Sequence, residues 1–316
     1  MFTTILSALL PVVLTMVLGY FAGRHHDFTP EHADVLNRLV LLYALPADLF
    51  VGMATTKRSN LSSSAPLIVT VVSAIVLSFA IAFVLSRKVL HKSPGTSALY
   101  ALAVSGPSVA FVGNSVLGYL YGQQESAIPI SIATLAINLV LVPLCLVLLD
   151  AEAAAGAAGM QKLDARALGK GLVRAVRQPM VWASILGLIV CLAGFDFPAS
   201  IERALGLLGA STGGVSIFAA GVILYAQKVT FSRTIGVLTI ARNLIVPGVA
   251  LLCIRLLGRT SAELNEAVIA LAIPAASMIV ILAVRYKTAE QEMASVLLYS
   301  TVGSIFSLSL FIWLTR

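Results

Sequence analysis

Several side chains that could bind a solute lie within strongly apolar stretches of the chain. Arg242 is part of the segment TIARNLIVPGVALL, and a charged side chain at the centre of a membrane helix costs at least about 2.5–3.5 kcal/mol. That cost predicts that Arg242 faces protein or a cavity, where its planar guanidinium could hold a carboxylate with two hydrogen bonds. Alternatively, Arg242 snorkels to the membrane surface or pairs with Asp48. The neighbouring Asn243 is an uncharged hydrogen-bonding side chain with the same two possible roles.

An acidic residue, Asp48, lies in the apolar segment ALPADLFVGM, directly after the helix breaker Pro46. A carboxylate at membrane depth could carry a coupling proton or contact a cation. It could equally be solvated or cap the half-helix that follows Pro46. Asn138 favours a hydrogen bond between helices over a contact with a solute. The run Ser211-Thr212-Gly213-Gly214 favours close helix packing, and its hydroxyls could also line a solute path.

Two apolar stretches are interrupted by helix breakers. Pro107 follows Gly106 in AVSGPSVAFVGNSVLGYLYG, and Pro274 lies in ALAIPAASMIVILAVRYKT. Proline removes a backbone hydrogen bond, and irregular backbone at membrane depth is tolerated where it is buried or lines a cavity. The half-helices that start after the breaks would present partial positive charge and free N–H groups, which suit an anion. The candidate binding residues around the breaks are Pro107, Ser108, Asn114, Ser115, Pro274 and Ser277.

Motifs for covalent chemistry are not recognisable in the sequence. There is no nucleophile–base pair, no Gly-x-Ser-x-Gly motif, no phosphate-binding loop and no cluster with metal-ligand spacing. We therefore expect no enzyme activity, no organic cofactor and no metal site.

The elements that would position these residues are membrane helices. Of the 316 residues, 59% are hydrophobic and 11% are charged, against roughly 45–50% and about 25% in globular proteins. The mean hydropathy is +0.98. This composition excludes a soluble enzyme, a disordered chain, a coiled coil and a disulfide scaffold, and predicts an all-α polytopic membrane protein. Ten stretches approach the length of a membrane span, about 20 residues: 4–23, 34–54, 65–86, 97–121, 127–149, 179–195, 203–226, 234–257, 266–284 and 292–314.

The basic residues predict the orientation of these spans. The net charge is +7, which we assign to membrane orientation instead of nucleic-acid binding. If both termini are outside, 13 Lys and Arg residues lie on the cytoplasmic side and 6 on the other side, as the positive-inside rule requires. The central segment 150–178 carries basic residues on one helical face, suited to anionic lipid headgroups: Lys162, Arg166, Lys170, Arg174 and Arg177.

The two halves of the chain resemble each other. Pro11-x7-Gly19 in the first span matches Pro179-x7-Gly187 in the sixth, at an offset of 168 residues, and Leu49-Phe50 matches Ile217-Phe218 at the same offset. Each half has five spans, so the second half must be inverted in the membrane. Inverted repeats with paired broken helices are typical of secondary transporters. The domain prediction is a first repeat over 1–149, a cytoplasmic basic linker over 150–178 and a second repeat over 179–316.

The chain resembles the auxin efflux carrier family, which includes malonate-type permeases and plant auxin carriers and is related in fold to bile-acid sodium symporters. The resemblance is carried by PSVAFVGNSVLGYLYG, AIPAASMIVILAVRYKTAEQEMASVLLYST and YALPADLF, and it extends over essentially the whole chain. Two positions depart from the usual pattern: Ser108 stands where Asn is common, and Ser115 where a second Pro is common.

The resemblance implies ten helices as a five-plus-five inverted repeat, with spans 4 and 9 broken where they cross. Spans 1, 2, 6 and 7 would form a scaffold and dimer surface, and spans 3–5 and 8–10 an elevator-like transport domain. The expected function is secondary transport of a small organic anion such as malonate, in a cell inner membrane, as a homodimer, coupled to H⁺, to Na⁺ or to nothing. The alternatives are a channel-like or ligand-sensing protein on the same fold, or a carrier for an auxin-like aromatic acid.

Overall fold

The computed structural model describes residues 2–55, 65–158, 177, 179–195, 198–227, 229–258 and 261–315. Within these ranges the chain is helical, and the only extended pairing is an isolated bridge between Pro107 and Ala275. Most of the predicted basic linker lies outside the described residues, including Lys162, Arg166, Lys170 and Arg174.

Helices of the first half follow the predicted apolar stretches. Their bounds are α1 (Phe2–Arg24), α2 (Pro30–Leu39), η1 (Val40–Ala44), α3 (Leu45–Ala54), α5 (Ala65–Lys88), α6 (Pro94–Ser105), η2 (Val109–Gly113), α7 (Asn114–Tyr121), α8 (Gln123–Ala136), η3 (Ile137–Leu141) and α9 (Val142–Ala158). The segments η1 and η3 are single π-helical turns inside otherwise continuous helices, whereas η2 begins after a chain break and leads into α7. Such turns are frequent at functional sites. Helix α9 runs nine residues past position 149, into the predicted linker, and the division into two repeats stays a prediction.

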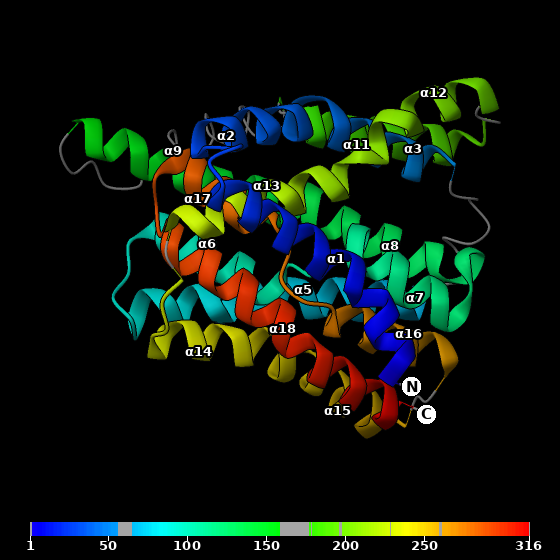
Figure 1. Ribbon diagram of the computed structural model, residues 1–316. Coiled ribbons are helices and arrows are strands. Elements are labelled where there is room, and N and C mark those ends of the chain that lie inside the picture. The colour runs from blue at the N-terminus through cyan, green and yellow to red at the C-terminus, as the bar shows by residue number, and fades with distance from the viewer. Residues whose placement is uncertain are drawn as a thin grey trace.

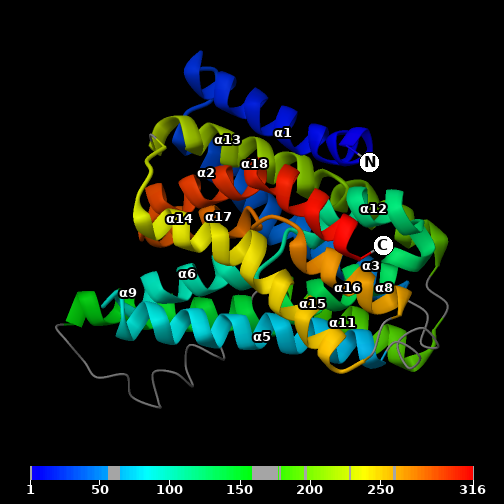
Figure 2. The same ribbon diagram turned by 90° about the horizontal axis from the view of Figure 1, so that it is seen from below.

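The second half is again a series of helices with one chain break, here between α16 and α17. Their bounds are α11 (Pro179–Ala193), α12 (Ala199–Gly209), α13 (Ser211–Gln227), α14 (Arg233–Ile240), η4 (Ala241–Ile245), α15 (Val246–Leu256), α16 (Ala262–Ala272), α17 (Met278–Tyr286) and α18 (Glu290–Leu314). Five of the described helices are long and apolar enough to cross a membrane by themselves: Pro30–Ala54, Ala65–Lys88, Ala199–Ala226, Arg233–Leu256 and Glu290–Leu314. The two ends of the chain lie at the same end of the molecule (Figures 1 and 2).

Two pairs of helices from different halves pack through backbone contacts. Helix α1 packs against α13, and α11 packs against α3. A Cβ atom added at Gly19 would lie 2.1 Å from the carbonyl oxygen of Phe218, and one added at Gly187 would lie 2.7 Å from that of Phe50. The offset of 168 residues converts Gly19 into Gly187 and Phe50 into Phe218. The same contact is therefore made twice, with the two halves exchanged.

The helices fall into two sets by their packing. The first set is α1–α3 with α11–α13, and the second set is α5–α9 with α14–α18. Figure 2 shows α1, α13 and α18 in succession, with α5 and α9 on the far side of the molecule. Helix α6 lies inside the second set, packed against α5 and α9, and every residue from Gly95 to Ser105 except Thr96 is buried.

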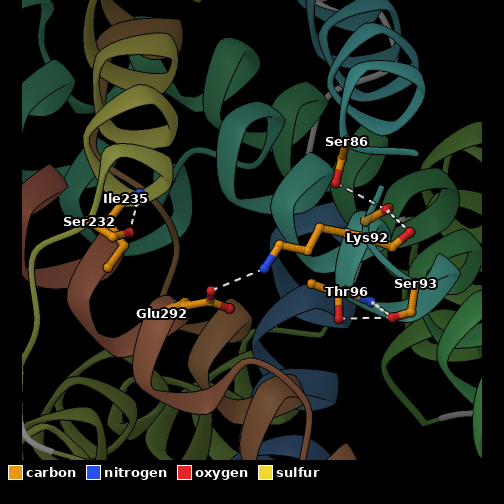
Figure 3. Close-up of polar contacts among 8 residues, drawn as sticks. Ser86, Lys92, Ser93, Thr96, Ser232, Ile235 and Glu292 are labelled. Carbon is orange, nitrogen blue, oxygen red and sulfur yellow. Dashed lines mark hydrogen bonds and ion pairs between the residues drawn. The ribbon is translucent and has the colours of Figure 1, made fainter. Parts of the chain in front are cut away.

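Polar contacts join helices at one end of the second set (Figure 3). Lys92, before α6, lies 3.5 Å from a carboxylate oxygen of Glu292 in the first turn of α18. The hydroxyl of Ser86 on α5 donates to that of Ser97 on α6 over 3.0 Å. These contacts join the ends of α5, α6 and α18. The two chain breaks lie elsewhere in the set, after α6 and after α16.

Candidate functional site

The two helix breaks cross each other at the centre of the molecule. Helix α6 ends at Ser105 and α16 at Ala272, close before Pro107 and Pro274. The N–H of Ser108 donates to the carbonyl of Pro274 over 2.8 Å, and the N–H of Ala276 donates to that of Gly106 over 3.1 Å. This antiparallel bridge satisfies backbone groups that the prolines release from helical bonding, as buried backbone in a membrane requires.

Arg242 binds the ends of the two helices that lead into the crossing. Its side chain has no exposed surface. The guanidinium donates to the carbonyls of Val104 over 2.9 Å, of Ile273 over 2.8 Å, and of Leu271. These carbonyls stand at the C-terminal, partially negative ends of α6 and α16. The sequence predicted that Arg242 contacts a substrate carboxylate, pairs with Asp48 or snorkels to the membrane surface. The described hydrogen bonds of the guanidinium go to carbonyls of the breaks, and its side chain has no exposed surface. Contact with a substrate stays a prediction.

Asn243 also supports the crossing. Its side-chain amide donates to the carbonyl of Ser300 over 2.8 Å, and the Ser300 hydroxyl donates back to the Asn243 side-chain oxygen over 2.7 Å. The same hydroxyl accepts the N–H of Ala275 over 3.0 Å. Asn243 therefore fixes the backbone of the second break through α18, and the residues that line the two cavities described below do not include it.

Described residues of the crossing line two small cavities. The larger has a volume of about 50 Å³ and the smaller about 10 Å³. The larger is lined by Val40, Leu45, Pro107, Ser108, Val109, Thr134, Ile137, Asn138, Thr212, Ser216, Ala276, Ser277, Met278 and Ile281. Ser108 and Ser277 also line the smaller cavity, together with Pro274. They precede the first turns of η2 and α17, so both half-helices begin at the larger cavity.

The remaining predicted residues have different positions. Asn114 and Ser115 form the first turn of α7, and their side chains lie outside the described part of the structure. Asp48 lies in the first turn of α3, and a Cβ added at Gly209 would lie 3.0 Å from its Cα. It faces the contact between α3 and α12, and it is not among the described residues that line either cavity.

Four polar residues of the larger cavity were missing from the predicted site. Thr134 and Asn138 lie one turn apart on α8 and η3, and Thr212 and Ser216 lie one turn apart on α13. The spacing i, i+4 places each pair on one helix face. Two polar residues at this spacing in an apolar span were the signal that could have identified them.

The polar side chains of the larger cavity do not all find hydrogen-bond partners among the described residues. The Ser277 hydroxyl donates to that of Ser216 over 3.3 Å, and the Asn138 amide donates to the carbonyl of Thr134 over 2.8 Å. The hydroxyl oxygens of Thr134 and Thr212 are buried without a hydrogen-bond partner among the described residues. A buried hydroxyl without a partner costs free energy, so both are free to bind a solute.

The electrostatics of the site follow from the helix ends. Among the described residues that line the two cavities, none carries a charged side chain. The partially positive N-termini of η2 and α17 begin at the larger cavity, while the partially negative C-termini of α6 and α16 are bound by Arg242. By the helix-dipole argument, two N-terminal helix ends at one cavity would favour an anion.

Comparison with known proteins agrees with this geometry. The chain is 31% identical over 317 residues to the "Uncharacterized transporter YfdV" of Escherichia coli (strain K12), covering 100% of this chain and 99% of that protein. It is 21% identical over 315 residues to the "Putative malonate transporter" of Rhizobium meliloti (strain 1021), covering 99% and 96%. The family described as "Membrane transport protein" matches residues 4–312. The chain therefore belongs to this membrane transporter family, the auxin efflux carrier family that its sequence predicted.

Proposed function

We propose that this protein is a secondary transporter that carries a small organic anion, of the mono- or dicarboxylate class and similar to malonate, by alternating access. One observation carries the proposal: two half-helix N-termini begin at one cavity, and Arg242 binds the opposite helix ends. A carboxylate between the N-termini would accept N–H bonds from both. The name of the relative from Rhizobium meliloti supports the same substrate class.

The proposed architecture has ten spans in a five-plus-five inverted repeat. The exchanged contacts Gly19–Phe218 and Gly187–Phe50 support the repeat, because an inverted pair of halves must make each such contact twice. The first set of helices would be the scaffold and the second set the moving domain. Ser216 and Ser277 then lie on opposite sides of the sliding surface, and their weak 3.3 Å contact is one that an elevator-like movement would break.

The surroundings of the protein complete the proposal. We place it in a cell inner membrane with both termini on the non-cytoplasmic side, as a homodimer in contact with lipids. Coupling to H⁺ or Na⁺ stays a prediction, with Asp48 as its candidate residue. The common position of the chain ends in Figures 1 and 2 supports termini on one side of the membrane.

Counterflow in proteoliposomes tests the transport function. Vesicles are loaded with unlabelled malonate, lactate or indole-3-acetate, and uptake of the same labelled acid is followed. With the membrane potential held at zero, a carrier gives saturable, transient accumulation of label, which neither a channel nor a ligand sensor produces. Accumulation of malonate is the expected result. Folded, inserted protein that gives no counterflow with any of the acids would refute the proposal, and a response to indole-3-acetate alone would favour the aromatic-acid alternative.

A matched pair of variants connects transport to the cavity. Asn138→Leu removes a polar side chain that lines the larger cavity, with little change in volume. Asn265→Leu makes the same change on α16, where the amide donates to the carbonyl of Thr315 over 2.8 Å, away from both cavities. Malonate uptake should fall about tenfold or more in the first variant and stay within twofold in the second.

A further inference from the structure

The larger cavity has a second group of polar side chains, which do not take part in the hydrogen bonds of the crossing. The hydroxyls of Thr134 and Thr212 line it from helices of different sets, and both oxygens are buried without a partner among the described residues. Thr212 has no exposed surface. In a membrane helix a threonine hydroxyl ordinarily returns to the carbonyl four residues earlier, as that of Thr301 does to Leu297 over 2.8 Å. Thr134 and Thr212 do not make this bond.

The position of Thr212 gives the distance along α13 between the crossing and the second polar group of the cavity. Ser216 contacts Ser277 at the start of α17, and Thr212 lies one turn from Ser216 on α13. One turn of an α-helix rises about 5.4 Å. Thr134 lies one turn from Asn138 in the same way. The described lining of the same cavity also includes apolar residues, among them Val40, Leu45 and Ile137.

We propose that Thr134 and Thr212 are specificity-determining residues that bind a second polar group of the substrate. The substrate class is then a short acid with hydrogen-bond acceptors at both ends and a short carbon chain between them, which is a dicarboxylate in preference to a monocarboxylate. One carboxylate lies at the half-helix N-termini, and the other accepts the two threonine hydroxyls. This inference rests on the proposed transport function and adds the selectivity of the same site.

Competition against labelled malonate counterflow tests the inference. The competitors are unlabelled malonate and isovalerate, in which an isopropyl group replaces one carboxylate with similar shape. The variants Thr134→Val and Thr212→Val remove one hydroxyl each without changing side-chain shape. Thr134→Ser and Thr212→Ser retain the hydroxyl. Thr239→Val is the matched control, because the Thr239 hydroxyl is also buried without a described partner but lies on α14, outside the described lining of both cavities.

Wild-type protein should prefer malonate over isovalerate by at least tenfold. In each cavity Thr→Val variant this ratio should fall about tenfold or more, since one hydrogen bond to a charged group is lost. The serine variants and Thr239→Val should retain the wild-type ratio. If wild-type protein gives malonate counterflow but both cavity Thr→Val variants keep its preference for malonate over isovalerate, this inference is wrong and the proposed transport function stands. Counterflow of lactate without counterflow of malonate also overturns this inference alone. Wild-type protein that gives no counterflow with any of the acids overturns the proposed transport function, and the inference falls with it.

Discussion

At the scale of single residues, the role of Arg242 follows from the atoms that its guanidinium contacts. Arg242 is buried at the crossing, as the cost of a charge in lipid requires, yet its donors bind the carbonyls of Val104, Leu271 and Ile273. The guanidinium binds the partially negative C-terminal ends of α6 and α16. The partially positive N-terminal ends of η2 and α17 would then dominate the potential of the cavity. Arg242 is thus a positioning residue of the crossing, and in the transport that we propose it would favour an anion through the helix ends and not by direct contact.

Substitution of Arg242 should therefore reduce stability together with transport. Arg242→Ala leaves three buried carbonyls without a donor, at about 1–3 kcal/mol for each unsatisfied group, so the thermal midpoint in detergent should fall strongly. Arg242→Lys keeps the charge but lacks the planar fork, and an intermediate loss is expected. Arg203→Ala on exposed α12 is the control and should change the midpoint little. An Arg242→Lys protein with normal stability and only a raised KM would instead favour direct contact with the substrate carboxylate.

A second residue-scale prediction concerns Ser300. Its hydroxyl joins Asn243 to the N–H of Ala275 in the second break. Ser300→Ala should cost about 1–2 kcal/mol of stability and lower transport. Ser309→Ala on the same helix removes a hydroxyl that bonds only to the carbonyl of Ile305, one turn away, and should be nearly neutral. Thermal unfolding of the two purified variants compares them, and equal midpoints would contradict a role for Ser300 at the crossing.

At the scale of elements, breaks and close contacts have separate causes. Proline ends α6 and α16, and the backbone bridge between the breaks replaces the lost helical bonds. Glycine lets α1 approach α13 and α11 approach α3 so closely that a Cβ would overlap a backbone oxygen. Small residues allow such contacts between membrane helices, where apolar burial gives little driving force. Proline thus interrupts helices of the second set, and glycine allows close helix contacts in the first set.

Alanine substitutions should separate contact glycines from free ones. Gly19→Ala and Gly187→Ala place a Cβ 2.1 Å and 2.7 Å from a carbonyl oxygen, so each should destabilise the protein by about 1–3 kcal/mol through overpacking. Gly206→Ala on α12 meets nothing within 4 Å and should be neutral or stabilising by up to about 1 kcal/mol, from helix propensity. The measurement is thermal unfolding by circular dichroism. Equal midpoints for all three variants would argue against the exchanged helix contacts.

At the scale of the whole molecule, the division into two sets predicts which contacts must break during transport. Ser216 and Ser277 lie on α13 and α17, in different sets, with their hydroxyls 3.3 Å apart. Ser86 and Ser97 lie on α5 and α6, in the same set, 3.0 Å apart. A movement of one set against the other would change the first distance and preserve the second.

Disulfide locking measures this difference. In a Cys253→Ser background, which removes the exposed cysteine, the pair Ser216→Cys with Ser277→Cys should transport when reduced and stop when oxidised. The pair Ser86→Cys with Ser97→Cys should transport in both states. Counterflow with and without reductant gives the comparison, and mass spectrometry verifies the disulfides. Continued transport by the oxidised first pair would exclude relative movement of the two sets at this contact.

The sequence by itself determined the helical membrane class, the family and the two breaks, because these depend on local properties. Apolar length identifies a span, and proline at 107 and 274 ends a helix whatever lies around it. It also predicted the repeat through matched glycine and phenylalanine positions, and the exchanged contacts of Gly19 and Gly187 now give that match a physical meaning.

The tertiary structure alone decided which polar residues share a cavity. Ser108 and Ser277 lie at it, as expected near the breaks, whereas Arg242 and Asn243 bind backbone, and Asp48 faces α12. Thr134, Asn138, Thr212 and Ser216 join the cavity because α8 and α13 pass beside the crossing. The physical reason is that a hydrogen-bonding side chain in an apolar helix must find a partner, and whether that partner is backbone, side chain or solute depends on neighbours distant in the chain.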